Sequence, residues 1–239
     1  MSELQLIYRD RHYVAVDKPA GMLVHRTRIS EDRRFVLQTL RDQLGCRVYP
    51  VHRLDRPTSG VLLFALSSEA ARRLVDRFQQ RRVEKRYLAV VRGYLDECGR
   101  VDYPLLSEGG VRQPAVTGYR RRATVELPLP VGRYATARYS LVELWPETGR
   151  MHQIRRHMKH LFHPVVGDTT HGEGRHNRLF REQFGVQRLL LMATGLRLEH
   201  PYSGAMLELE LYPDGEMQRL FGRLGWDQSC WTSSSTAWA

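Results

Sequence analysis

Hydrophobic and polar positions repeat with two different periods along the chain, and the two periods predict different elements. Short apolar runs bounded by turn residues predict strands, and apolar residues that recur every three to four positions predict helices. The predicted strands cover residues 4–8, 13–16, 61–66, 87–91, 123–127, 135–145, 189–192 and 206–211. The predicted helices cover residues 35–44, 67–82, 152–161 and 217–224. Because the strands outnumber the helices without a regular β-α alternation, we expect an α+β fold with a mixed, largely antiparallel sheet flanked by helices and loops.

Turn and capping residues support several of these boundaries. Ser67 or Ser68 supplies a hydroxyl that caps the start of the helix at 67–82. Gly45 follows the helix at 35–44, in the position that glycine prefers at a helix end. The last segment, 227–239, is rich in Ser and Thr and contains isolated Trp residues. We expect this segment to be a disordered tail.

The bulk properties of the chain exclude several classes of protein. Its 239 residues suffice for one large domain or two small ones with a real core. No apolar run reaches the roughly 18 residues that a membrane span needs, and residues 1–4 lack the basic and apolar stretches of a secretory signal. The three cysteines, Cys46, Cys98 and Cys230, are far apart in sequence and odd in number, which argues against a disulfide framework or a thiolate zinc site. We therefore expect a cytoplasmic protein with no membrane partner.

The charge of the chain points to a polyanionic partner. There are 37 Lys and Arg against 26 Asp and Glu, a net charge of +11, and only three of the cations are lysines. Arginine has a planar fork that binds phosphate and stacks on bases, so this composition favours nucleic acid. A basic solvated surface is the alternative. We interpret Arg73, Arg77 and Arg81, spaced four apart on one predicted helix, as such a solvated face, although these side chains could also reach phosphates.

The stretch His52–Gly60, HRLDRPTSG, is the first candidate for chemistry. It is a turn that leads into a buried strand, and Asp55 lies between Arg53 and Arg56. Neighbouring cations favour the ionised form of a carboxylate, and a carboxylate that stays ionised can act as a nucleophile or base without a cofactor. By composition alone, an ion pair in a loop is the better interpretation of this stretch.

Three further stretches have the residue types of a nucleic-acid site. Lys85-Arg86-Tyr87 places an aromatic ring that could stack on a base beside two cations. Thr148–His157, TGRMHQIRRH, gathers arginines and histidines at the start of a predicted helix, where phosphate or a partner carboxylate would bind. Lys18-Pro19-Ala20-Gly21 is a tight turn after a strand. Each of the three also fits an ordinary structural role when it is taken alone.

In this order and at this spacing, the four stretches HRLDRPTSG, KRY, TGRMHQIRRH and KPAG resemble the motifs of the RluA family of pseudouridine synthases. The resemblance covers about residues 5–226. It implies the pseudouridine synthase catalytic fold over 1–226, a tail over 227–239, and no S4-type RNA-binding domain. It also implies an enzyme, an isomerase without cofactor or metal, that breaks the uracil–ribose N-glycosidic bond, turns the base and rejoins it through carbon.

The resemblance assigns roles to individual residues of this chain. Asp55 matches the catalytic aspartate, which the family uses either to attack the sugar or to remove a ribose proton. Tyr87 matches the tyrosine that packs on the target base, and Arg155 matches the arginine that pairs with the catalytic carboxylate. Arg53 matches a residue used when the base is flipped out of its stack. Lys85 and Arg150 are further candidate contacts to the RNA because they are cations within these motifs.

The resemblance further implies an RNA partner and no DNA, and we expect a monomer. The expected substrate is tRNA, at uridine 65, and the alternative is ribosomal RNA. Residues 191–193 depart from the family, since relatives often have Leu-His-Ala where this chain has Leu-Met-Ala.

Two readings from other classes compete with this one. A metal-dependent nuclease would use the histidines that crowd one region, with Asp168 and Glu173 as the nearby carboxylates. These histidines are His152, His157, His160, His163, His171 and His176. A non-catalytic RNA-binding module would explain the charge and the aromatic residues, but it leaves a carboxylate among arginines without a purpose.

Overall fold

The computed structural model describes residues 3–25 and 34–232. The chain divides into two compact units, each built from separate stretches of sequence. The first unit draws on Met1–Lys85 and Ala193–Leu211, and the second on Arg86–Met192 and Tyr212–Ala239. Strands β5 (Val83–Arg92) and β11 (Leu191–Glu199) each contribute residues to both units.

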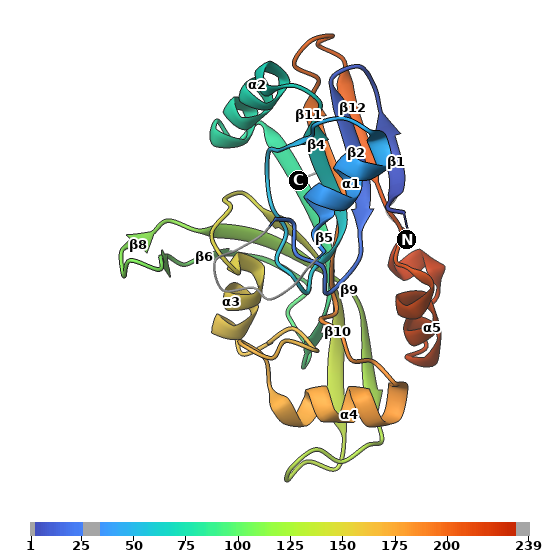
Figure 1. Cartoon of the computed structure of the whole chain (residues 1–239). Helices are drawn as coiled ribbons and strands as arrows, with labels where there is room; N and C mark the ends of the chain where they lie inside the picture. The colour runs from blue at the N-terminus through green and yellow to red at the C-terminus, as the bar shows by residue number, and fades with distance from the viewer. Residues whose placement is uncertain (1–2, 26–33, 233–239) are drawn as a thin grey trace. The chain divides into compact units, whose positions relative to one another are not determined.

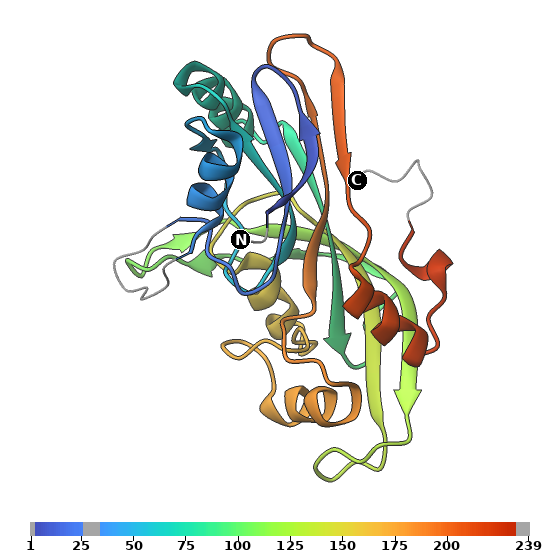
Figure 2. The ribbon, with the colours of Figure 1, turned by 45° about the vertical axis from the view of Figure 1, so that its right-hand side comes forward.

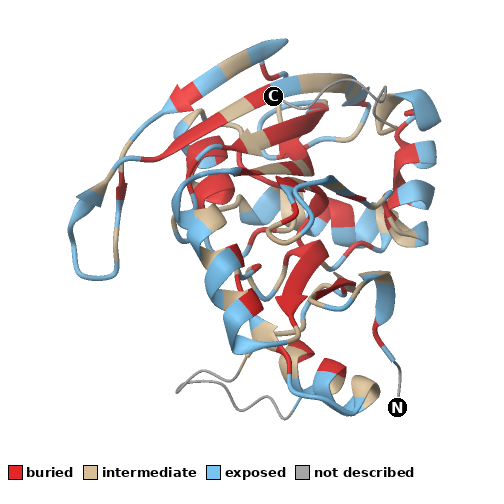
Figure 3. Cartoon of the chain, turned by 90° about the horizontal axis from the view of Figure 1, so that it is seen from above, coloured by how far each residue is buried: buried red, intermediate tan, exposed pale blue. Residues whose placement is uncertain are grey.

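The sheet of the first unit has the strand order β1-β2-β4-β11, with β3 paired to β4 and β12 paired to β11. These strands are β1 (Gln5–Arg9), β2 (Tyr13–Lys18), β3 (Tyr49–Pro50), β4 (Ser59–Ala65) and β12 (Met206–Glu210). The pairs β1–β2, β2–β4, β3–β4 and β11–β12 are antiparallel. All residues of β4 are buried, as expected for a strand with neighbours on both sides. Strands β2 and β11 are also mostly buried, whereas β1 and β12 are mostly exposed or half-buried; Figure 3 colours buried residues red. The predicted hairpin at 4–16 and the predicted buried strand at 61–66 are therefore confirmed.

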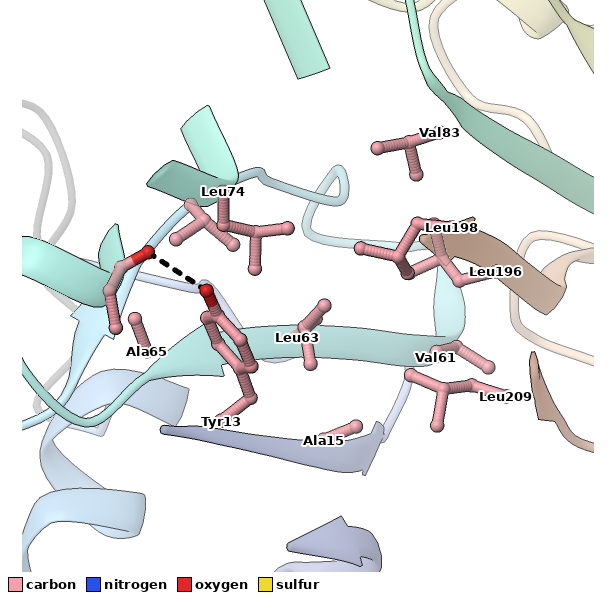
Figure 4. Packing of buried hydrophobic residues seen from close by; sticks show 12 residues of the cluster. Tyr13, Ala15, Val61, Leu63, Ala65, Leu74, Val83, Leu196, Leu198 and Leu209 are labelled. Atoms are coloured by element: carbon pink, nitrogen blue, oxygen red, sulfur yellow. Dashed lines mark hydrogen bonds between the residues drawn. The ribbon is translucent and has the colours of Figure 1, made fainter. Parts of the chain in front are cut away.

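Helices α1 (Val36–Leu44) and α2 (Ser68–Gln79) lie beside these strands (Figure 1). The Ser67 side chain accepts a hydrogen bond from the Ala70 N–H at 3.1 Å, which confirms the predicted cap. One face of α2 packs on the sheet, where Leu74 is fully buried near Leu63 and Tyr13 (Figure 4). Burial of this apolar stripe stabilises the helix more than its intrinsic propensity does.

The second unit contains an antiparallel sheet with the order β5-β10-β9-β6. Its other strands are β6 (Cys98–Asp102), β9 (Val116–Leu127) and β10 (Ala137–Pro146), and a separate hairpin joins β7 (Leu105–Leu106) to β8 (Arg112–Gln113). The long strands β9 and β10 run side by side (Figure 2). Strand β9 begins seven residues before the predicted 123, because Val116–Arg120 pair with β6 and residues 117–120 also pair with β10, so backbone pairing rather than an apolar run holds this part of the strand.

The helices of the second unit are α3 (Gln153–His160), α4 (Gly174–Phe184) and α5 (Gly215–Arg223). The sequence predicts α3 and α5, but α4 has too few apolar positions to show a helical period. It forms because its buried face packs on the sheet: Phe180 lies edge-on to Tyr139 of β10, with ring centroids 4.8 Å apart. Gly185 ends the helix in the left-handed conformation.

The expected disordered tail differs from the structure over its first residues. Gln228–Cys230 form a short 3₁₀ helix, and the Trp231 ring lies 5.2 Å from that of Phe221. Arg122 donates from Nη2 to the carbonyls of Ser229 and Thr232, both at 3.3 Å. An aromatic anchor thus orders this polar segment up to residue 232, and residues 233–239 lie outside the described part of the chain. Within the described residues, no helix has the length and apolar character to cross a membrane.

Candidate active site

In the first unit, Asp55 lies in the loop that connects β3 to β4. Leu54 is buried and anchors the loop in the core, while Asp55 itself is half-buried. The Thr58 N–H donates to the Asp55 carbonyl at 3.1 Å, which closes a tight turn around Pro57. Thr58 and Ser59 are buried directly after this turn. The loop therefore presents Asp55 on a turn that is fixed at both ends.

Lys18, from the KPAG turn, binds the backbone of the loop that carries Asp55. Its side chain is fully buried, and Nζ donates to the carbonyls of Pro19, Arg56 and Thr58 at 2.9, 3.1 and 2.7 Å. Gly21 and Arg56 add two bonds between the same segments: the Gly21 N–H donates to the Arg56 carbonyl at 2.9 Å, and Arg56 Nε donates to the Gly21 carbonyl at 3.0 Å. The sequence pattern indicated only a tight turn here. The structure shows that the turn also fixes the loop of Asp55 through these hydrogen bonds.

His52 and Gly60, at the two ends of the HRLDRPTSG motif, have structural roles. The Leu63 N–H on β4 donates to His52 Nε2 at 3.0 Å, and the imidazole stacks on Phe78 of α2 with centroids 4.8 Å apart. Burial, with a smaller effect of the Lys85 charge, lowers the pKa of His52 to about 3, so the ring stays neutral and remains an acceptor. Gly60 has φ +111°, and a Cβ there would lie 2.1 Å from the Ala193 carbonyl oxygen. Only glycine fits this position.

The two cations predicted to bind substrate in this unit differ in their surroundings. Arg53 is exposed, and within the described residues its side chain has no hydrogen-bond or ion-pair partner. Lys85 is half-buried; burial, together with the nearby charge of Arg81, lowers the pKa of Lys85 to about 8. Lys85 therefore carries most of its charge at neutral pH and loses it as the pH rises past that value.

In the second unit, the TGRMHQIRRH motif builds the start of α3. Gln153 is buried, and its Nε2 donates to the Val116 carbonyl at 2.8 Å, which ties the first turn of the helix to β9. The Thr148 hydroxyl donates to Gln153 Oε1 at 2.6 Å and accepts from the Val116 N–H at 3.0 Å. These bonds fix the direction in which α3 presents its next side chains, Ile154 and Arg155.

Arg155 forms a buried ion pair with Asp168. Its Nε lies 2.7 Å from Oδ2 and its Nη2 lies 2.8 Å from Oδ1, and the side chains are 4% and 1% exposed. Burial alone would raise the pKa of Asp168, but hydrogen bonds from Arg155 and from the N–H groups of His171 and Thr170 outweigh it and lower the pKa. The guanidinium is therefore held in one orientation by a bidentate partner.

Asp168, the ion-pair partner of Arg155, is a residue that the sequence indicates only as a possible metal ligand. The available signal was a Gly-Asp pair after an apolar run, at Val165–Asp168, because such a pair places an acid on a tight loop. The structure bears this out, since Gly167 has φ +80° and a Cβ there would lie 2.0 Å from the Arg188 carbonyl oxygen.

Tyr87 and Arg150 complete the predicted residues of this unit. Tyr87, on β5, packs against a buried cluster that includes Ile154 and Met158 of α3. The tyrosine thus borders a cluster to which the helix of Arg155 contributes. Arg150 donates from Nε to the Pro114 carbonyl at 3.1 Å, so this bond directs its side chain to a neighbouring loop.

Comparison with known proteins identifies the family. The family model for RNA pseudouridylate synthase matches residues 12–160. A tRNA pseudouridine synthase C of Vibrio cholerae serotype O1 is 51% identical over 238 residues, covering 95% of this chain and 98% of the relative. Another, from Yersinia pestis, is 52% identical over 235 residues, covering 93% and 91%. The chain belongs to the RNA pseudouridylate synthase family.

A solved pseudouridylate synthase supports the same conclusion. The human RNA pseudouridylate synthase domain containing 1 matches with a TM-score of 0.71 and 28% identity, covering 96% of this chain and 88% of that one. The resemblance to this family that the motifs indicated, and the α+β fold that it implied, are confirmed.

The histidines of this pseudouridylate synthase are engaged in separate structural contacts. His157 hydrogen-bonds to Thr117 and to the Tyr103 carbonyl, and His163 to the Arg92 carbonyl. The remaining pairs are His152 with His171, His176 with Tyr139, and His160 stacked on Tyr103. Over residues 3–25 and 34–232, no group of three or more His, Cys, Asp or Glu side chains converges to hold a metal ion.

The predicted site residues of this synthase divide between the two units. Asp55, Arg53 and Lys85 belong to the first, and Tyr87, Arg155 and Arg150 to the second. The pairing of Arg155 with Asp55 and the contact of Tyr87 with a target base stay predictions.

Proposed function

We propose that this synthase acts on tRNA and isomerises one uridine, uridine 65, to pseudouridine, with Asp55 as the essential carboxylate. The relatives named tRNA pseudouridine synthase C, about half identical over nearly the whole chain, support the substrate. The observation that carries the chemistry is the loop of Asp55, which Lys18, His52 and Gly60 hold in a single conformation. A preorganised carboxylate is what a cofactor-free displacement at the sugar requires.

The reaction conserves every atom of the nucleoside. The bond from uracil N1 to ribose C1′ breaks, the base turns, and a bond forms from C5 to C1′, while the C5 hydrogen leaves as a proton and N1 gains one. Asp55 either attacks C1′ or removes the C2′ proton, and both routes need the ionised carboxylate. A primary isotope effect with deuterium at C2′ would identify proton removal, and its absence would support attack at C1′.

In this proposal the other side chains position the target. Arg155, which Asp168 holds through Nε and Nη2, pairs with the Asp55 carboxylate and orients it. Tyr87 stacks on the loosened base, and Lys85, Arg150 and Arg53 contact the RNA. Arg53 fills the space that the flipped base leaves, which offsets part of the unstacking cost of a few kcal/mol. Arg53→Ala should weaken binding more for a paired target than for an unpaired one; equal losses would exclude this role.

The experiment that tests the proposal measures tritium release from tRNA labelled at C5 of uridine. The wild-type chain should release tritium, and Asp55→Asn should abolish release while tRNA binding remains. Asp76→Asn, an exposed acid on α2, is the matched control and should behave as wild type. A wild-type protein that binds tRNA and releases nothing would be a binding module and would end the proposal.

The substrate is tested separately by mapping pseudouridines in total RNA from cells with and without the protein. Loss of a single site in tRNA, at uridine 65, is the expected result. Loss of a site in ribosomal RNA instead would keep the chemistry and reject the tRNA target.

We further propose that the catalytic part is residues 1–226 and that it acts as a monomer in the cytoplasm. Sedimentation of the purified chain at the mass of a dimer would contradict the monomer.

A further inference from the structure

Three residues other than glycine have positive φ within the described part of the chain, and all lie beside the site motifs. They are Arg81 (58°), His152 (53°) and Phe162 (63°). Side chains with a Cβ disfavour this conformation, and such positions persist where the side chain serves a function. His152 has a visible reason, because its Nδ1 lies 2.9 Å from Nε2 of His171. Among the described residues, no hydrogen bond or ring contact gives the Phe162 side chain a comparable reason.

Phe162 occupies a position at the end of α3 where glycine is preferred. The Phe162 N–H donates to the Lys159 carbonyl at 3.0 Å, and the His163 N–H donates to the Met158 carbonyl at 2.9 Å. This pair of bonds is the Schellman arrangement, whose left-handed residue is usually glycine. After three other helices the chain does use a left-handed glycine, namely Gly45, Gly185 and Gly225. The turn itself therefore does not call for a phenylalanine.

Packing of the hydrophobic core does not explain a phenylalanine at position 162 either. The Phe162 side chain is 82% exposed, more than any other exposed large apolar residue of the described chain; the next is Val111 at 63%. The turn is anchored by the following residue, since His163 Nδ1 lies 2.7 Å from the Arg92 carbonyl oxygen. A phenyl ring in this strained position that faces solvent is available to a partner outside the protein.

The surroundings of Phe162 favour a nucleotide as the partner. Lys159 is exposed three residues before it, on the same side of α3 as Arg155, and its charge acts on His171 beside Asp168. His160, also exposed, stacks on Tyr103 with ring centroids 3.7 Å apart. Cations interleaved with aromatic rings fit single-stranded RNA, because phosphates and bases alternate along it. An apolar pocket of a partner protein would not need the cations.

We propose that Phe162 stacks on an unpaired base of the RNA substrate and that Lys159 contacts the adjoining phosphate. Phe162 follows Arg155 by seven residues, or roughly 10 Å along the helix, so the stacked base is a neighbour of the target uridine rather than the target itself. The proposal rests on the proposed function for its RNA substrate. It adds a second recognition point, separate from the catalytic residues.

The test uses Phe162→Gly, for which stability and binding should change differently. Glycine relieves the positive φ and removes almost no buried surface, so the midpoint of thermal unfolding should stay the same or rise. The dissociation constant for an unmodified tRNA transcript should rise about 5- to 100-fold, the loss of one stacked base. Phe162→Trp should bind within about threefold of wild type, since it keeps the stacking face.

Tyr134→Ala is the matched control, because Tyr134 is also highly exposed, at 61%, in the turn between β9 and β10. It should leave tRNA binding within about twofold. Wild-type affinity in Phe162→Gly would overturn the proposal, and so would equal losses in the glycine and tryptophan variants. A wild-type dimer that Phe162→Gly dissociates would assign the ring to a second copy instead. Binding is measured without turnover, so failure of the isomerase proposal would appear separately, as absent tritium release.

Discussion

Asp168→Asn tests whether the buried ion pair with Arg155 stabilises the second unit. Both side chains are at most 4% exposed and share two charge-assisted hydrogen bonds. Asparagine has nearly the same shape and keeps one carbonyl oxygen for the N–H groups of Thr170 and His171. It removes the buried carboxylate charge that Asp168 places against the guanidinium, which costs about 3–5 kcal/mol. For a chain of this size we expect the unfolding midpoint to fall by about 2–4 °C per kcal/mol.

The assay is urea unfolding of the wild type and the variant at several pH values. Because the folded-state pKa of Asp168 is lowered, its contribution is present above the unfolded pKa and is lost as the pH falls through the folded value. The difference between wild type and Asp168→Asn should therefore be full at pH 7 and shrink below about pH 4. Turnover should fall as well, since Arg155 loses its fixed orientation.

Asp214→Asn provides the comparison. Asp214 pairs with Arg188, but it is 35% exposed, and asparagine still accepts from the Met217 N–H at the start of α5. Asp214→Asn should lower the free energy of unfolding by less than about 1 kcal/mol. If Asp168→Asn costs no more than Asp214→Asn at pH 7, the ion pair does not stabilise the fold as argued. The double variant Arg155→Met with Asp168→Asn should recover stability relative to Asp168→Asn, because it also removes the buried positive charge that Asp168 balances.

Three further changes test the loop of Asp55. Lys18→Met removes the ammonium that donates to three carbonyls, so the free energy of unfolding in urea should fall by about 3 kcal/mol and most of the turnover should be lost. Unchanged turnover would show that Lys18 does not fix the loop of Asp55. The pKa of His52 is about 3, so its imidazole should be neutral by NMR at pH 5. Because the unfolded chain binds this proton below pH 6.5 and the folded chain does not, the free energy of unfolding should fall by about 1.4 kcal/mol per pH unit below pH 6.5. An imidazole that titrates near pH 6.5 in the folded protein would contradict this. Gly60→Ala should prevent soluble expression or cost more than about 3 kcal/mol, whereas Gly174→Ala, with nothing within 4 Å, should be harmless.

How well the sequence predicted an element depended on where its stabilisation comes from. Helix α2 was predicted within a few residues, at 67–82 against Ser68–Gln79, because its cap and its apolar period are local. Helix α4 was not, because Phe180 gains its packing from Tyr139, a residue far away in the chain. The long strand β9 was predicted only in part for the same reason, since pairing on both edges holds its polar half.

The site shows the same division. The motifs placed Asp55 on a turn and Arg155 near the start of a helix, and both placements are confirmed. The partner of Arg155 was not predicted, because Asp168 reaches it only through a loop whose course depends on Gly167 meeting the Arg188 carbonyl. The role of Lys18 was also not predicted, although a lysine in a chain dominated by arginine was a signal.

The choice of lysine at position 18 follows from geometry. Its Nζ converges on three carbonyl oxygens from one point, and a compact ammonium satisfies three acceptors in this way, whereas a planar guanidinium does not. Arg155 is the opposite case: a carboxylate with two parallel oxygens suits the guanidinium fork. Both cations are buried, and both are neutralised or solvated by groups of the chain itself, so neither is available to phosphate. Attraction of RNA must then come from exposed cations such as Arg53 and Lys159. The positive charge of this chain therefore serves two physically distinct purposes, and only the exposed part should be screened by salt.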